Sequence, residues 1–232
     1  MLISTIIPAL NEAENIRQTI TVARRSYTPG GVEVIVVDGG STGGTPDLLP
    51  SNVALAWSPR GRAVQMNRGA AASHGETLIF CHADSQLPIG WREAVIETLD
   101  QPGVSGGAFQ TLILSARGTF MHIRNRMRFP VNWWRMYGDQ AQFMTRATFE
   151  RTGGFPEIPL MEDAEMARAL HQERQLVKID NPRVITSSRR FLERGFLRQS
   201  LMNLWSIFRY LCLGATSKDI ARVYRSSREK AA

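Results

Sequence analysis

Cysteine is scarce in this sequence, which has only Cys81 and Cys212 among its 232 residues. Two cysteines cannot build the disulfide framework on which many small secreted domains depend. Cys81 lies in an apolar run of strand length, and Cys212 lies in an apolar helical run. We therefore expect both to be buried free thiols in a protein of a reducing compartment.

Long hydrophobic runs are also missing, since no stretch reaches the roughly 18 apolar residues of a membrane-spanning helix. The nearest, Phe196–Leu213, is interrupted by Arg198 and Arg209. At its N-terminus the chain runs directly into an apolar strand, without the basic region and small-residue cleavage site of a signal peptide. These absences predict a cytoplasmic protein, and peripheral contact with the inner face of the cell membrane stays open.

Two common phosphate-binding motifs are absent. The turn after the first apolar run reads PALNEAEN and has no glycine, which excludes the G-x-G-x-x-G of a dinucleotide fold. The loop Gly39–Thr45 is rich in glycine but has no lysine, and Pro46 follows it directly. It is therefore not a Walker A loop.

Acidic residues are few near the C-terminus. The net charge of the whole chain is +7, but Arg183–Ala232 contains eleven Lys and Arg against three Asp and Glu, a net of +8. Residues 1–182 therefore carry 7 − 8 = −1. This distribution fits an anionic surface or ligand near the C-terminus and argues against nucleic acid as a partner of the whole chain.

An alternation of strands and helices fills the first hundred residues. Apolar runs predict strands at Leu2–Ile7, Val32–Val37, Val53–Trp57 and Thr77–Cys81. Helical spacing predicts helices over Arg62–His74 and Trp91–Leu99, and Asn11 with Glu14 is typical of a capping box before a first helix. The alternation predicts βαβ units, and so an α/β fold with a mostly parallel sheet flanked by helices.

The second half of the chain is less regular. Strand-like runs lie at Val104–Leu114, Ala141–Thr145 and Leu176–Ile179, and a helix is predicted over Glu162–Glu173. Gly106-Gly107 is expected to weaken its strand, because glycine has no side chain to pack. A further basic and apolar helix is predicted over Arg117–Phe129, and a turn over Asp180-Asn181-Pro182 after the last of these strands.

Polar residues stand where a parallel sheet would expose its working edge. Asp38 and Asp84 each follow a strand, Asp163 opens a helix, and Asn11-Glu12 follows the first strand. The carboxyl ends of parallel strands meet at one edge, so these residues are predicted to converge. Each alone is equally well explained as a turn or cap residue. Asp84 in particular suits Mg²⁺ or Mn²⁺ on a phosphate, or a helix cap.

From about Ile3 to about Arg190 the sequence resembles the family-2 glycosyltransferases with the GT-A fold. The resemblance rests on six segments, which read IIPALNEAENI, VIVVDGGSTGGT, PRGRAVQMNRGAA, FCHADSQLP, GDQAQFMTRATFERTGGF and LMEDAEMARAL. It implies a GT-A catalytic domain over residues 1–190 and leaves residues 191–232 as a basic amphipathic helical extension.

The resemblance also implies roles on the donor side. The residues expected to contact a nucleotide-sugar, most readily a UDP-sugar, are Pro8, Asn11, Glu12, Asp38, Arg60, Gln65, Asn67, His82, Asp84 and Arg189. Asp84 matches the last Asp of the family's DxD motif and would bind Mn²⁺ or Mg²⁺ on the diphosphate. His82 stands in place of the first Asp, and as a neutral imidazole it would either ligate the metal or orient a neighbour.

On the acceptor side, the resemblance assigns Asp163 as the general base and Glu162 as its neighbour in the ED motif. Inverting transfer to an acceptor hydroxyl follows from this arrangement, on a small molecule or a lipid-linked one. Gly138, Asp139 and Gln140 would line the acceptor segment, and Trp134 would stack on the acceptor or close a hydrophobic lid. The alternatives are a sugar nucleotidyltransferase and a non-catalytic nucleotide-sugar-binding or membrane-binding module.

The C-terminal extension has a helical apolar stripe. It consists of Leu197, Leu201, Leu204, Phe208 and Leu211. Such a stripe usually docks on the main domain or on a second subunit, as in a homodimer, and that is the outcome we expect. Because arginines surround it, contact with an anionic membrane face is the alternative.

Overall fold

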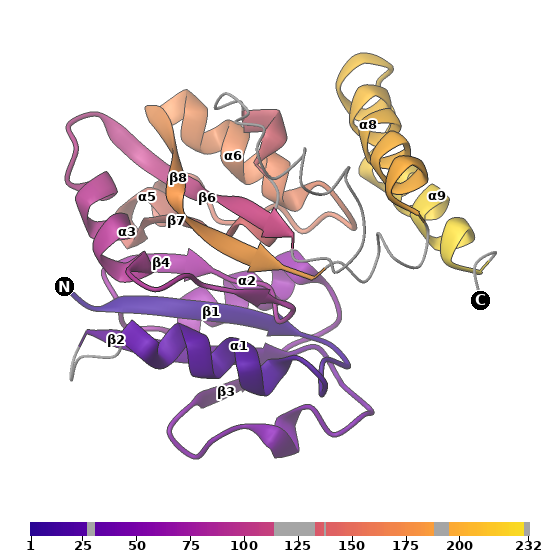
Figure 1. Cartoon of the computed structure of the whole chain (residues 1–232). Coiled ribbons are helices and arrows are strands. Elements are labelled where there is room, and N and C mark those ends of the chain that lie inside the picture. The colour runs from indigo at the N-terminus through magenta and orange to yellow at the C-terminus, as the bar shows by residue number, and fades with distance from the viewer. Residues whose placement is uncertain (27–30, 114–132, 137, 188–194, 230–232) are drawn as a thin grey trace.

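The computed structural model describes residues 1–26, 31–113, 133–136, 138–187 and 195–229, and the predicted helix over Arg117–Phe129 lies outside these ranges. One eight-stranded sheet forms its centre, in the order β3-β2-β1-β4-β7-β6-β8-β5 (Figure 1). Four of its seven strand pairings are parallel and three are antiparallel. The predicted α/β class and mostly parallel sheet are confirmed, as a mixed sheet.

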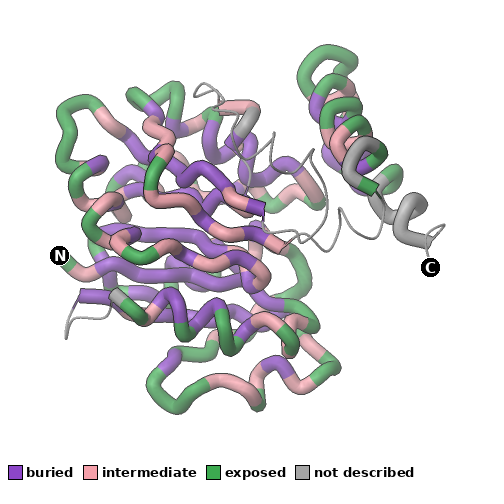
Figure 2. Tube along the Cα trace, viewed as in Figure 1, coloured by how far each residue is buried: buried purple, intermediate pink, exposed green. Residues whose placement is uncertain are grey.

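The parallel half of the sheet comes from the first 80 residues. Its strands are β1 (Ile3–Ala9), β2 (Val32–Asp38), β3 (Ala54–Trp57) and β4 (Thr77–Phe80). β1 lies between β2 and β4, and its last residue, Ala9, pairs with Asp38 at the end of β2. Nearly every residue of β1, β2 and β4 is buried, as near-continuous apolar runs predict for a parallel sheet covered on both faces (Figure 2).

Helices cover both faces of the sheet. Helices α1 (Ile16–Ala23) and α3 (Trp91–Leu99) contribute Ile16, Ile20, Trp91 and Val95 to one core. Helices α2 (Arg62–Ala72) and α6 (Glu162–Glu173) contribute Met66, Met166 and Leu170 to the other. A short helix, α5 (Arg146–Arg151), follows the strand β7. The result is a layered α/β/α arrangement, in which the sheet edge between the helix layers is where loops can build a site.

The other half of the sheet mixes strand directions. It consists of β5 (Ser85–Gln86), β6 (Val104–Ile113), β7 (Gln142–Thr145) and β8 (Gln175–Thr186). β6 continues through the predicted weak point at Gly106-Gly107, but its register against β8 shifts between Val104 and Gly106. A Cβ on Gly106 would lie 2.7 Å from the Phe143 carbonyl oxygen, so glycine lets β6 approach its neighbours closely.

Two further expectations are corrected by the structure. Asn11 is not a helix cap, because α1 begins only at Ile16, with Asn15 in the capping position and no capping bond from its side chain. The turn expected at residues 180–182 is instead part of β8, which runs unbroken to Thr186 and contains a cis peptide bond before Pro182. The strand absorbs this segment with a register shift against β6 between Phe109 and Thr111.

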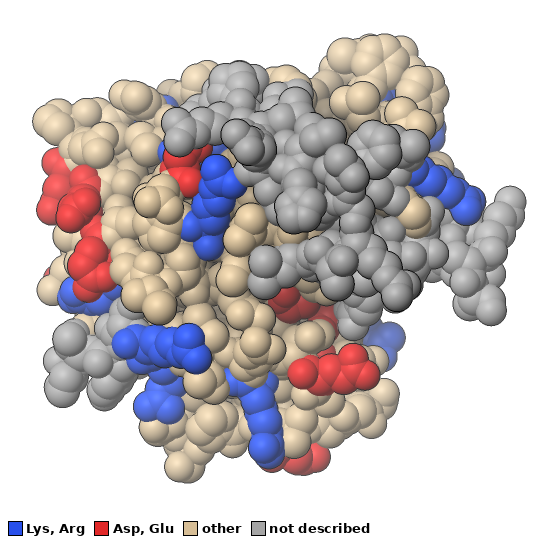
Figure 3. Space-filling model, in the orientation of Figure 1, with Lys and Arg blue, Asp and Glu red and all other residues tan. Residues whose placement is uncertain are grey.

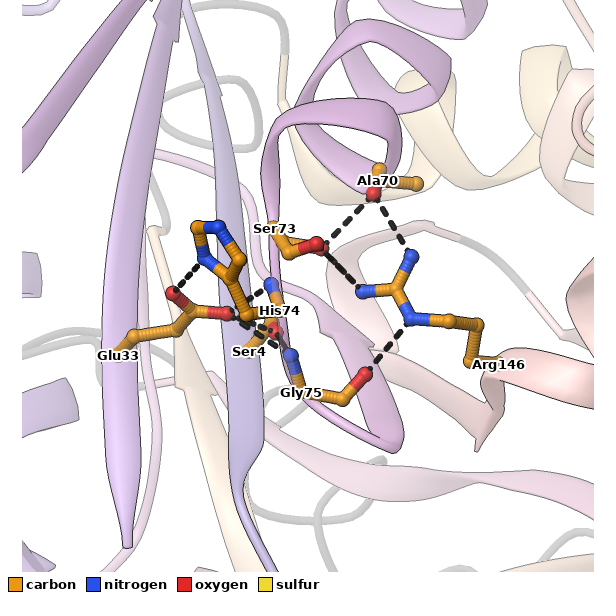
Figure 4. A network of polar contacts seen from close by, with 7 residues as sticks. All are labelled: Ser4, Glu33, Ala70, Ser73, His74, Gly75 and Arg146. Atoms are coloured by element: carbon orange, nitrogen blue, oxygen red, sulfur yellow. Dashed lines mark hydrogen bonds and ion pairs between the residues drawn. The ribbon is translucent and has the colours of Figure 1, made fainter. Parts of the chain in front are cut away.

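A polar network closes the end of the sheet opposite the predicted site (Figure 4). The Arg146 guanidinium donates to the carbonyl oxygens of Ala70, Ser73 and Gly75 at 2.8–3.0 Å, and so caps the C-terminus of α2. Glu33 accepts hydrogen bonds from Ser4 and from the backbone of Gly75. Burial favours a higher pKa for Glu33, but these bonds and those from His74 outweigh it and hold the pKa below its usual value.

Two helices follow the main domain, α8 (Phe196–Cys212) and α9 (Ser217–Glu229). They dock beside α6 through a small cluster that contains Met161, Ala164, Ile207 and Ile220. The expectation for Cys212 is wrong, since its thiol is exposed, whereas Cys81 is buried as predicted. Among the described residues, no helix combines the length and apolar character needed to cross a bilayer.

Candidate functional site

The predicted working edge exists. The carboxyl ends of β1, β2 and β4 lie side by side, because Gly39 N donates to Ala9 O at 3.0 Å and Cys81 N donates to Ile6 O at 2.9 Å. Asp38 ends β2, and His82-Ala83-Asp84 directly follow β4 and Cys81. Residues from separate parts of the sequence therefore stand along one edge of the sheet, where open α/β sheets bind ligands.

Asp38 is held by the loop that follows it. Its side chain is fully buried, and Oδ1 accepts from the backbone nitrogens of Gly40 and Ser41 at 2.8 and 2.7 Å. Oδ2 is buried as well and has no hydrogen-bond partner among the described residues. An unsatisfied carboxylate oxygen in such a place costs stability, so an N–H or O–H donor of a ligand is well matched to it.

The loops after β1 and β2 are tied together. Asn11 N donates to the Ser41 hydroxyl at 2.8 Å, and the side-chain oxygen Oδ1 of Asn11 accepts from Thr42 N at 2.9 Å. Glu12 N donates to the buried hydroxyl of Thr45 at 3.0 Å. Pro8 lies within buried β1, next to Val37. These bonds give Asn11 and Glu12 a defined place beside the end of β2.

Two other predicted donor-side residues have a structural task. The Gln65 amide nitrogen donates to Ala9 O at 2.7 Å and to Val37 O at 2.8 Å, and thus joins α2 to the ends of β1 and β2. The Asn67 side chain donates from Nδ2 to Phe155 O at 2.8 Å and accepts at Oδ1 from Phe155 N at 2.9 Å. These bonds fix the position of both side chains, and the donor-binding role of Gln65 and Asn67 stays a prediction.

His82 and Asp163 meet at Gly138. A Cβ on Gly138 would overlap His82 Nε2 and would lie 3.4 Å from Asp163 Oδ2. Asp163 Oδ2 accepts from Gly138 N at 2.6 Å, and its Oδ1 accepts from Ala164 N at 2.8 Å. Residues 82, 138 and 163 thus form one compact group, and a side chain at position 138 would require the imidazole to move.

Arg62 is a residue that sequence reasoning missed. Its Nε lies 2.6 Å from Glu162 Oε1, and the Glu162 side chain is only 1% exposed. Burial raises the pKa of Glu162, an effect that Arg62 opposes and Asp163 increases. Burial lowers the pKa of Arg62, but Glu162, Asp163 and Asp139 outweigh it and raise that pKa above its usual value. One guanidinium therefore faces three carboxylates. The sequence marks Arg62 only as a basic residue just after the loop that contains Arg60, which does not indicate its partners.

Two hydrogen bonds hold the His-Ala-Asp turn in place. Thr19 on α1 donates its hydroxyl to Ala83 O at 2.7 Å, and Ser85 N closes the turn on His82 O at 3.0 Å. Burial raises the pKa of Cys81, and the negative charge of nearby Asp84 raises it further.

Within the described part of the chain, no three His, Cys, Asp or Glu side chains gather to hold a metal ion by themselves. The turn therefore offers Asp84 and His82, and Mg²⁺ characteristically adds substrate phosphates to so few protein ligands.

The segment predicted to line the acceptor lies beside α6. Gly138–Gln140 forms a short 3-10 helix, in which Gly138 and Gln140 are buried and Asp139 is half-buried. Gln142, which the sequence did not single out, donates to the carbonyl oxygens of Met136 and Asp163 and so joins this segment to α6. Trp134 packs against the cluster of the C-terminal helices. Arg60 is exposed, and Arg189 lies outside the described residues.

Backbone strain is found at the same edge. Asn11, Ala141 and Met161 have positive φ angles of 56°, 49° and 72°, although none is glycine. Such residues cost roughly 1–3 kcal/mol each and persist where the surroundings require them, commonly at functional sites. Each lies in or beside a segment named above, after β1, before β7 and before α6. The strain at Met161 sets the direction in which α6 presents Glu162 and Asp163.

Comparison with known sequences agrees with this geometry. Residues 4–156 match the family model described as Glycosyl transferase family 2. Glycosyltransferase AglE of Haloferax volcanii is 31% identical over 111 residues, which cover 44% of this chain and 36% of that protein. The present chain therefore spans only about a third of the length of this relative.

Solved structures share the fold. The mannosyltransferase PcManGT from Pyrobaculum calidifontis, solved with GDP-Man and Mn²⁺, superposes with a TM-score of 0.70 at 20% identity, covering 92% of this chain and 65% of that one. S. aureus TarS 1-349 in complex with UDP-GlcNAc superposes with a TM-score of 0.65 at 15% identity, covering 81% of this chain and 58% of that one.

Proposed function

This chain belongs to glycosyl transferase family 2, and we propose that it transfers a sugar from a nucleotide-sugar to an acceptor hydroxyl. The observation that carries the proposal is the meeting of His82 and Asp163 at Gly138, on the sheet edge that also bears Asp38. A donor-binding turn and a carboxylate base from distant parts of the sequence would thereby lie on opposite sides of the anomeric carbon, the turn at the leaving group and the base at the acceptor hydroxyl.

The donor would enter along the ends of β1 and β2. The unpartnered Oδ2 of Asp38 is suited to accept an N–H of the base, while Pro8, Asn11 and Glu12 border the same loop. Arg60 would approach the nucleotide from the loop after β3. We propose UDP as the nucleotide, as in the TarS complex, and GDP, as in the PcManGT complex, is the alternative to test.

A divalent ion fits the turn after β4. Asp84, with His82 beside it, would hold Mn²⁺ or Mg²⁺ against the diphosphate, whose oxygens would complete the coordination. When bound, such an ion acts as a Lewis acid and stabilises the negative charge of the leaving nucleoside diphosphate. Thr19 and the Ser85 backbone fix this turn independently of any ligand.

Asp163 is the proposed general base. It would take the proton of the acceptor hydroxyl while the new bond to the anomeric carbon forms and the nucleoside diphosphate leaves from the opposite face, so the product is inverted. Bonds from Gly138 and Ala164 hold the carboxylate in one orientation. Glu162, paired with Arg62 and almost fully buried, acts as a positioning residue and not as a second base.

Asp139 and Gln140 would line the acceptor, a small molecule or a lipid-linked one. Because both cysteines are free thiols, we place the reaction in the cytoplasm.

The test is an assay of UDP- and GDP-sugars with Mn²⁺, which measures release of the nucleoside diphosphate. We expect Asp84→Ala and Asp163→Asn to abolish turnover, whereas only Asp84→Ala also weakens donor binding. NMR of the product should show an inverted anomeric configuration. Release of pyrophosphate would indicate a nucleotidyltransferase, and a retained configuration would remove Asp163 from the role of base.

A further inference from the structure

Helix α8 carries its apolar face outward. The exposed apolar face, as we name it, consists of Leu201, Leu204, Trp205, Phe208 and Leu211, which are 39–66% exposed. At 100° per residue these five side chains lie within one third of the helix circumference. Trp205 and Phe208 stack on each other, with ring centroids 5.7 Å apart. For Leu201, Leu204, Phe208 and Leu211 of the predicted stripe, docking on the main domain is therefore wrong, and docking on a second subunit stays a prediction.

The opposite side of α8 is the one that docks. Gln199 and Ser206 are each 2% exposed there, and Ile207 joins the cluster with Met161 and Ala164. The Tyr210 hydroxyl donates to Glu165 Oε1 on α6 at 2.8 Å. A surface helix of a globular protein normally shows the reverse pattern, with its apolar side inward. Because of this inverted pattern, the outer face of α8 is better suited to contact with an apolar surface than with water.

The helical pair is firmly attached despite this inversion. The Ser217 hydroxyl at the start of α9 accepts a hydrogen bond from Leu160 N at 3.0 Å and donates one to Leu160 O at 2.6 Å. Leu160 lies three residues before Asp163, so the C-terminal helices rest on the segment that leads into the candidate site. The exposed apolar face is consequently a fixed feature of the molecule.

Basic residues border the exposed apolar face. On the helix, Arg198 and Arg209 lie at one edge of it, and on α9 Lys218 and Arg222 are exposed. The charged side chains visible on the C-terminal helices in Figure 3 are basic, whereas the main domain shows both signs. The sequence from Arg183 onward carries a net charge of +8. An apolar surface beside a cationic edge is complementary to the headgroup region of an anionic bilayer.

We propose that the exposed apolar face of α8 inserts into the surface of an anionic lipid bilayer, with Trp205 and Phe208 at its centre. A second copy of the chain is the less suitable occupant. In a twofold dimer the same patch meets itself, so the second copy brings the same cationic edge and no opposite charge. Lipid headgroups supply the opposite charge.

The experiment is flotation of the full chain, without donor, with vesicles of phosphatidylcholine alone or mixed with phosphatidylglycerol. We expect binding to the anionic vesicles and much weaker binding to the neutral ones. The double variant Trp205→Ser, Phe208→Ser should lose at least about tenfold in partitioning. The variant Arg198→Gln, Arg209→Gln should lose roughly thirtyfold, and on anionic vesicles only. Ile89→Ser, which removes an apolar side chain that is 80% exposed and lies far from α8 in the sequence, is the matched control and should bind as the parent does.

Two outcomes would overturn the proposal. One is equal flotation of the parent and of the Trp205, Phe208 variant. The other is a dimer, measured by sedimentation equilibrium, that this same variant dissolves, since a second copy would then occupy the face. Unchanged melting temperatures would show that the variants are folded. Because flotation uses no nucleotide-sugar, its result is independent of whether the proposed transferase activity is found.

Discussion

Replacing Arg62 by methionine should destabilise the protein through the charge that it leaves behind. Arg62 is the ion-pair partner of Glu162, whose side chain is 1% exposed. Removing one partner of a buried pair costs about 3–5 kcal/mol when both are deeply buried. The Arg62 side chain is 30% exposed, so water can approach the vacated place, and we expect a smaller loss of roughly 2–3 kcal/mol. For a domain of this size the melting temperature should fall by about 4–12 °C.

The loss should depend on pH, with a sign that follows from Glu162. Burial raises the pKa of Glu162 above its unfolded value, and Arg62 limits that rise. Without Arg62 the folded pKa rises further. A raised folded pKa contributes stability that is complete below the unfolded pKa, about 4.3, and is lost as pH rises through the folded pKa. The variant should therefore differ most from the parent at neutral pH and approach it as the pH falls.

Urea unfolding of four proteins tests this reasoning. They are the parent, Arg62→Met, Glu162→Gln and the double variant, each measured from about pH 5 to about pH 8. In the double variant the charge of Glu162 is removed together with its partner, so most of the lost free energy of unfolding should return, and its pH dependence should resemble that of Glu162→Gln. If Arg62→Met loses the same free energy at every pH, or if Glu162→Gln fails to restore it, the uncompensated charge of Glu162 is not the cause.

Three other substitutions have clear expected results. Asp38→Asn keeps the oxygen that accepts from Gly40 and Ser41 and alters only the unpartnered one, so calorimetry with UDP should show binding weakened by about 10- to 100-fold at nearly unchanged stability. Gly138→Ala places a methyl group against His82 and near Asp163, so both kcat and donor affinity in Mn²⁺ should fall, whereas Gly103→Ala, at an open turn, should leave both unchanged. Glu33→Ala removes bonds that hold the Glu33 pKa below its usual value, so its cost of about 2 kcal/mol should be full above about pH 5 and should shrink in acid as the parent itself loses this contribution.

The sequence predicted the convergence of the site because strand direction determines where strand ends meet. Asp38 and Asp84 each follow an apolar run, and an alternating pattern of strands and helices makes those strands parallel. Their ends then share an edge, whatever the lengths of the loops between them. The helix boundaries at Trp91–Leu99 and Glu162–Glu173 were predicted for a similar reason, since they follow from local spacing and, for the second helix, from acidic residues in its first turn.

Contacts between distant residues could not be predicted in the same way. Gln65 and Asn67 stand in a segment that resembles a donor-binding motif, yet their amide groups bond to backbone atoms 28 to 88 positions away. Arg62 reaches Glu162 across a hundred residues. Nothing in local propensity or spacing encodes such pairs, because they depend on how whole helices are placed on the sheet.

Helix α8 shows the limit of periodicity most clearly. A spacing of three and four residues establishes that Leu201, Leu204 and Phe208 share a face, but it does not determine whether that face turns inward. The observed direction goes with contacts far apart in sequence, which are the apolar cluster of Ile207 with Met161 and the polar contacts from Tyr210 to Glu165 and from Ser217 to Leu160. These contacts align α8 with the entry to α6 and leave the apolar stripe outside. In water alone the stripe facing inward would gain about 25 cal/mol for each Å² of apolar surface buried, so the observed orientation is best explained if another apolar phase covers the stripe in use.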